Sequence, residues 1–111
     1  MELKIDFGEP IIGPEQAAAL TCGDLDAFYC ASSELDGLNL FFILLASLHH
    51  YEDAGDFGLA ARLSFLAAYY LFMPLTPPGS WPLAMHYIEK ALRLDPRPEY
   101  REWRELMEKG N

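Results

Sequence analysis

Two apolar stretches in the middle of the chain constrain its fold more than any other feature. Leu38 to Leu48 contains eleven residues, too few to cross a bilayer. Phe57 to Leu75 contains nineteen, but Arg62, Ser64 and Pro74 interrupt it. We therefore expect both stretches to be buried core helices and expect no association with a membrane.

The front of the chain combines an extended segment with two short helical segments. Residues 2–7 alternate strictly between charged and apolar side chains, which is strand periodicity. We expect residues 1–13 to form an extended N-terminal arm. Pro14 predicts the start of a helix that ends near Gly23. Asp24 or Asp26 then caps a segment that Asp36-Gly37 terminates.

Longer helices are expected in the remainder of the chain. The apolar stretches predict helices over about 38–52 and 57–73, with Asp56 as the cap of the second. A proline-rich loop follows, and Ser80 is the expected cap of a helix over 81–94. The last helix is predicted over 98–109, with Gly110 past its end. The predicted fold class is all-α, with about five helices in one domain over residues 14–111.

Net charge narrows the class of partner. The chain has 17 acidic and 8 basic residues, a formal net charge of −9. Eleven of the acids but only one base, Lys4, lie in residues 1–61. An acidic surface repels phosphate, so we expect no nucleic acid partner. A basic or apolar protein segment is the better match.

The two cysteines, Cys22 and Cys30, show no disulfide or metal-ligand pattern. On one helix they are about 12 Å apart, too far for a disulfide. Unpatterned thiols are typical of a reducing compartment, and the charged N-terminus does not look like a signal peptide. We therefore expect a cytoplasmic protein.

Small and large residues recur at fixed spacing in the second half of the chain. In the segment AMHYIEKALRLDP, Ala84, Ile88, Ala91 and Pro96 have the spacing of the second helix of a tetratricopeptide repeat, and the segment resembles that helix nearly throughout. The resemblance covers about residues 38–109. It implies antiparallel helical hairpins that cross closely at small residues.

The first helix of such a repeat fits in two registers. One is anchored at Tyr51, with the repeat's usual nine-residue step to Ala60. The other is anchored at Tyr70, with five extra residues before Ala84. Both registers stay open at this stage.

The resemblance implies a groove that binds a polypeptide, lined by the first helix of each repeat. In the Tyr51 register the groove residues are Phe42, Leu45, His49, Glu52 and Asp53. In the Tyr70 register they are Ala61, Ser64, Ala68, Leu71 and Phe72. The first set is apolar with an acidic end and suits an amphipathic segment bearing Lys or Arg. The expected function is a non-catalytic adaptor or small chaperone.

Two alternatives come from other classes. His49, Glu52 and Asp53 share a helix face at i,i+3 and i,i+4 spacing, so a metal or small-ligand site around them is one alternative. The other is a structural subunit of a homo-oligomer, a homodimer in the simplest case, because the helix over 38–48 is apolar nearly all round. No catalytic motif or cofactor motif is apparent, and we expect no enzyme activity, no cofactor and no metal.

Overall fold

The computed structural model describes residue 6 and residues 8–110, and within these the chain forms helices and no strand. The predicted all-α class is confirmed. The helices are α1 Pro14–Ala19, α2 Cys22–Ala31, α3 Glu34–Asp53, α4 Phe57–Tyr70, α5 Ser80–Leu94 and α6 Pro98–Lys109, and a π-helical turn, η1 Leu71–Leu75, extends α4. The alternating pattern over 2–7 lies mostly outside the described residues.

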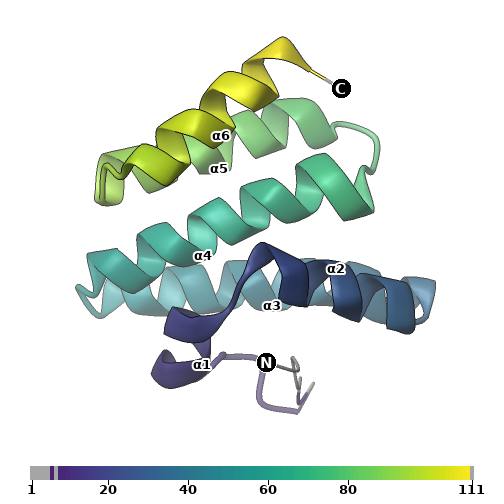
Figure 1. Cartoon of the computed structure of the whole chain (residues 1–111). Helices are drawn as coiled ribbons and strands as arrows, with labels where there is room; N and C mark the ends of the chain where they lie inside the picture. Colours follow the sequence, from purple (N-terminus) through teal and green to yellow (C-terminus); the bar gives the residue numbers. More distant parts are fainter. Residues whose placement is uncertain (1–5, 7, 111) are drawn as a thin grey trace.

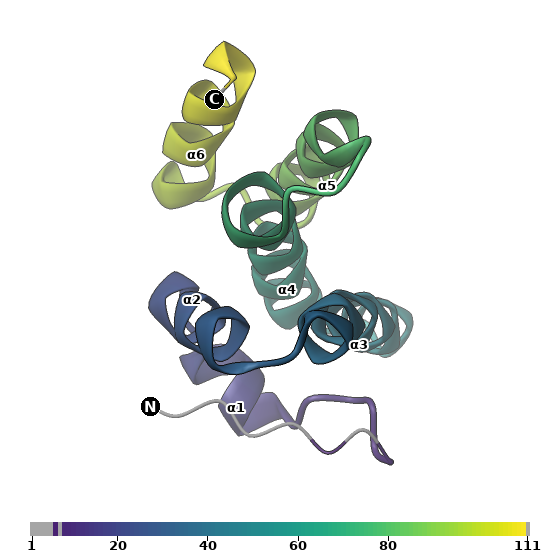
Figure 2. The same ribbon diagram turned by 90° about the vertical axis from the view of Figure 1, so that its right-hand side faces the viewer.

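Helix α4 lies at the centre of the molecule. Viewed end on, α2 and α3 lie on one side of it and α5 and α6 on the other (Figure 2). Helices α3, α4 and α5 follow one another in alternating directions (Figure 1). Residues Leu63–Phe72 are all buried. The stretch Phe57–Leu75 is long and apolar enough to cross a membrane, but 67% of its most apolar window is buried inside the protein, as in a core helix.

Alanines let the central helices approach closely. Ala60 and Ala67 of α4 and Ala84 and Ala91 of α5 are all 0% exposed. The two helices are antiparallel (Figure 1), and small side chains at the crossing shorten the distance between their backbones. This burial confirms the predicted pairing of the segments 57–73 and 81–94.

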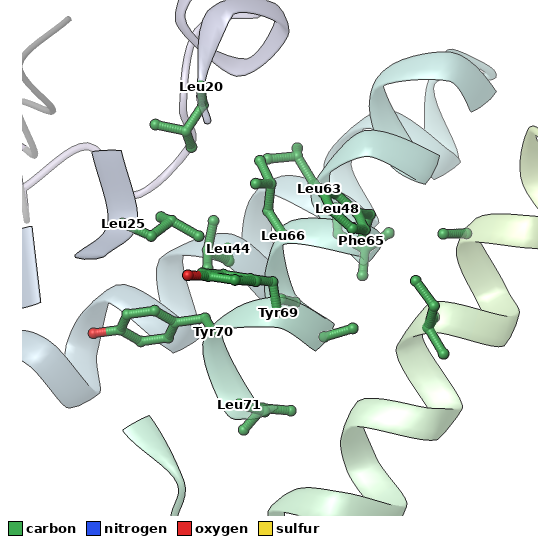
Figure 3. Close-up of a cluster of buried hydrophobic side chains, with 14 of the residues drawn as sticks. Leu20, Leu25, Leu44, Leu48, Leu63, Phe65, Leu66, Tyr69, Tyr70 and Leu71 are labelled. Carbon is green, nitrogen blue, oxygen red and sulfur yellow. The ribbon is translucent and has the colours of Figure 1, made fainter. Parts of the chain in front are cut away.

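Larger side chains fill the space around the crossing. Leu25 of α2 and Leu44 of α3 lie next to the side chains of α4 (Figure 3). On the other side, the Phe65 ring stacks on Tyr100 of α6 at 5.0 Å between centroids. One continuous core therefore joins the N-terminal helices to the C-terminal pair.

Two predicted boundaries near the N-terminus were wrong. Gly23 does not end α1 but lies in the first turn of α2, where Thr21 is the cap and forms a reciprocal capping box with Asp24. Asp36-Gly37 does not break a helix either. The break falls at Ser32-Ser33, because the Ser33 hydroxyl accepts a hydrogen bond from the Asp36 N–H (3.1 Å) and starts α3 there.

The proline-rich loop also differs from the prediction. Ser80 is not a cap: Gly79, with a positive φ of 80°, precedes the helix and Ser80 is its first residue. The helix over 57–73 ends as a regular helix at Tyr70 and continues as the turn η1. Pro74 lacks an N–H, and the Thr76 N–H instead donates to the Leu71 carbonyl (3.2 Å), a wider turn.

The described end of the N-terminal arm is fixed to α3. The Ile12 N–H donates to the Ser47 hydroxyl oxygen (2.9 Å), and the Tyr51 hydroxyl donates to the Ile12 carbonyl (2.5 Å). Ile12 itself is 4% exposed. One side of α3 is therefore covered by residues 10–12, a second side by α4, and a third remains open.

Candidate functional site

The open side of α3 presents apolar side chains to solvent. Leu40, Leu44 and Leu48 face the core and are fully buried. Leu38 and Phe42 lie about 120° and about 160° around the helix axis from Leu44, and they are 41% and 58% exposed. Leu45, between them and the core, is half-buried and packs against the core cluster. An apolar strip thus runs along α3 where most surface helices carry polar residues.

Helix α5 continues this apolar surface. Leu83, Tyr87 and Lys90 lie on the side of α5 that faces α3, at i, i+4 and i+7. The Tyr87 ring meets the Phe41 ring of α3 edge to face, at 6.4 Å between centroids. Leu83, one turn before Tyr87, is 44% exposed. We refer to Leu38, Phe42, Leu45, Leu83 and Tyr87 as the α3–α5 face.

A polar cluster closes one end of the α3–α5 face. The Lys90 ammonium nitrogen lies 2.8 Å from Glu52 Oε2, and His49 Nδ1 lies 3.6 Å from Glu52 Oε1. The hydrogen bond from Lys90 holds the pKa of Glu52 below its ordinary value. Asp53 ends α3 and is exposed. Glu52 is therefore ionised at neutral pH.

The same cluster was the candidate metal site. Within residue 6 and residues 8–110, no group of three or more His, Cys, Asp and Glu residues could hold a metal ion. One oxygen of Glu52 is already bound by Lys90, and Asp53 ends the helix as an exposed residue. The geometry of these side chains is an ion-pair cluster between two helices.

The structure separates the two predicted groove sets. In the Tyr51 set, Phe42, His49 and Asp53 are exposed, and Leu45 and Glu52 are half-buried. In the Tyr70 set, Ala61, Ser64, Ala68, Leu71 and Phe72 are at most 5% exposed. The Ser64 hydroxyl is used internally, where it donates to the Ala60 carbonyl (2.8 Å). These five side chains belong to the core and offer no surface to a partner.

Sequence reasoning missed the contribution of α5. Leu83 and Tyr87 belong to the same surface as Phe42, and Lys90 neutralises part of its acidic end. The i, i+4, i+7 spacing of Leu83, Tyr87 and Lys90, on the side of α5 next to the buried Ala84, Ile88 and Ala91, was a usable signal. That α5 lies beside α3 follows only from the packing of both helices on α4.

Cys22 does not add a reactive site. Burial raises the pKa of the Cys22 thiol to about 12, which keeps it protonated at neutral pH. Cys30 is exposed, and both thiols are free. Cys22 is therefore a packing residue in this fold.

Comparison with known proteins leaves the function to be argued from these residues. No protein-family model matches the chain, and no match is found among curated proteins or solved structures.

Proposed function

We propose that this protein is a non-catalytic interaction module that holds an amphipathic, basic helical segment of another protein on the α3–α5 face. The observation that carries the proposal is the exposure of Leu38, Phe42 and Leu83 on two neighbouring helices. Adjacent exposed apolar side chains with a polar border are typical of protein-binding surfaces.

The charge of the protein favours a basic partner. The formal net charge is −9, and Glu52 and Asp53 lie at one end of the face, while Glu34 and Asp36 begin α3 at the other. Lysines or arginines at the ends of a bound segment meet these carboxylates, while its apolar side chains cover Phe42 and Leu83. A second copy of the chain brings another nine negative charges, which opposes a homodimer at this face.

The dimensions favour a helix as the bound element. From Leu38 to Asp53, α3 rises about 22 Å, which matches four turns of a partner helix. An amphipathic helix laid on such a surface places anchors at i, i+3 or i+4, and i+7. The succession of the hairpins α3–α4 and α5–α6 supports the tetratricopeptide-like reading, in which α3 and α5 are the first helices of two repeats and carry the binding surface. An adaptor or a small chaperone is the role that fits this reading.

The test compares matched surface variants. Tagged wild type, the double variant Phe42→Ser/Leu83→Ser and the control Leu106→Ser are expressed in the native host, and partners are recovered and cross-linked. Leu106 is 50% exposed on α6 and lies outside the α3–α5 face, so the control removes a similar apolar side chain.

The expected result is one stoichiometric partner that the control retains and the double variant loses by at least tenfold. Its cross-linked segment is basic and amphipathic. Equal recovery by all three proteins contradicts the assignment of the face. A cross-linked segment that is acidic contradicts the proposed basic partner. Self-association that Phe42→Ser/Leu83→Ser abolishes contradicts the proposal that the face binds another protein.

A further inference from the structure

A pocket of about 620 Å³ lies away from the α3–α5 face, where α1 and the first turns of α4 and α6 meet. Figure 2 shows α6 to the left of α4 and α3 to its right, with α1 below α4. The volume is in the range of sites that bind small organic molecules. Its walls combine the apolar residues Ala18, Leu59 and Pro98 with the side chains of Arg62 and Arg97.

Arg62 is the only base within the apolar helix α4, and most of its donors are committed. Its Nη2 donates to the Leu20 carbonyl (2.7 Å), and its Nη1 pairs with Glu99 Oε1 (2.8 Å). The Arg62 Nε is buried and has no hydrogen-bond partner. The Nε is closed off from the pocket, but each Nη nitrogen carries a second N–H, so the Arg62 guanidinium can still donate at this wall.

Arg97 adds a second guanidinium to the lining of the pocket. Its side chain is 62% exposed, and only Nε is bound, to Asp95 Oδ2 at 2.7 Å. Both Nη groups are left to solvent or to a molecule in the pocket. Guanidinium groups bind carboxylate and phosphate oxygens with paired, charge-assisted hydrogen bonds.

Two helices direct their positive ends to the same space. Gly58 and Leu59 belong to the first turn of α4, and Pro98 and Glu99 to the first turn of α6. The N-terminal N–H groups and the helix dipole favour an anion at such a point.

The two carboxylates in the wall already have partners. Asp56 Oδ1 accepts from the Leu59 N–H (3.2 Å), and Glu99 pairs with Arg62. Their charges are thereby partly offset by these contacts.

We propose that this pocket binds a small organic molecule that carries one oxyanion group, carboxylate or phosphate, beside a ring or short apolar chain. The oxyanion lies between the two guanidinium groups, and the apolar part contacts Leu59 and Tyr100. This site is independent of the α3–α5 face, so its test does not depend on the protein partner.

The probes are phenylphosphate and benzoate, with phenol and benzylamine as neutral and cationic controls. Each is titrated up to about 10 mM into labelled protein while the amide resonances are followed. Both anionic probes are expected to shift the Gly58 and Glu99 amides with saturation. The Phe42 and Leu83 amides, on the other side of the molecule, are expected to stay in place.

A matched pair of variants tests the role of the guanidinium. Arg97→Gln is expected to weaken phenylphosphate binding at least tenfold. Arg101→Gln, which removes the same charge from an exposed position one turn later, in α6 and outside the pocket, is expected to change it less than twofold. Saturable shifts with benzoate alone identify a carboxylate site. Saturable shifts with phenylphosphate alone identify a phosphate site. Absence of saturable shifts with both anions, or equal weakening by Arg97→Gln and Arg101→Gln, overturns the proposal.

Discussion

Helices α3 and α4 are both strongly apolar, yet the fold uses them in different ways. Helix α4 has neighbours on all sides, and every residue from Leu63 to Phe72 is buried. Helix α3 is covered by α4 on one side and by residues 10–12 on another, and it leaves Phe42 58% exposed. The comparison teaches that apolar composition does not distinguish a core helix from a binding helix. The number of packing partners does.

The largest expected difference between the two helices is in how much the loss of one large side chain lowers the stability of the fold. Leu66→Ala in α4 removes a fully buried side chain and is expected to lower the free energy of unfolding by about 2–5 kcal/mol. Phe42→Ala in α3 removes an exposed side chain and is expected to change it by about 0.5 kcal/mol or less. Urea denaturation of both variants measures the two values. Similar losses for both would remove the distinction between a core helix and an open one.

A substitution on the covered side of α3 is expected to have a smaller effect on the stability of the fold. Ser47→Ala removes the acceptor of the Ile12 N–H, which is buried, and is expected to cost about 1–3 kcal/mol. Hydrogen exchange of the Ile12 amide is expected to become faster in this variant. Ser80→Ala is the control, because Ser80 makes no capping hydrogen bond, and it is expected to stay within about 0.5 kcal/mol of wild type. An unchanged Ile12 exchange rate in Ser47→Ala would show that the arm does not depend on this contact.

The smallest effect is expected from the ion pair at the end of the α3–α5 face. The Glu52 pKa is below its ordinary value of 4.5 because Lys90 donates to the carboxylate. A lowered carboxyl pKa stabilises the fold above the ordinary pKa, and this contribution disappears as the pH falls through the lowered value.

The free energy of unfolding of wild type is therefore expected to exceed that of Glu52→Gln by no more than about 1 kcal/mol at pH 7. The difference is expected to shrink as the pH falls below 4.5. Denaturation curves at several pH values measure it, and Glu105→Gln, an exposed charge on α6, controls for net charge. A difference that stays constant down to pH 2.5 would contradict the role assigned to Lys90.

Local signals in the sequence predicted most of the helical segments. Pro98 and Gly110 bracket α6 because these residues act through their own backbone, and Asp56 begins α4 because its side chain accepts the Leu59 N–H. The same reasoning failed at Asp36-Gly37, where a packing requirement prevailed. The Gly37 carbonyl accepts a hydrogen bond from the buried Tyr70 hydroxyl, and a Cβ at Gly37 would lie 3.3 Å from the Tyr29 ring. A glycine that resembled a helix breaker is therefore a close-packing residue inside α3.

The candidate site was only partly predictable for the same reason. The helix periodicity of α3 indicated Phe42 and Leu45, but it fitted the Tyr70 set, including Ala68, equally well. Only the packing of α2, α5 and α6 around α4 shows which set is covered. Arg62 is a second example: in the sequence it interrupts an apolar stretch, whereas in the fold it links the Leu20 carbonyl to Glu99 of α6.

Amide hydrogen exchange of the protein with and without its co-purified partner tests the central claim most directly. We predict that the partner slows amide exchange in α3 and α5, around Phe42 and Leu83. Exchange in α6 is expected to stay as it is in the free protein. Protection confined to α6 or to α1 and α2, with α3 and α5 unchanged, would contradict it.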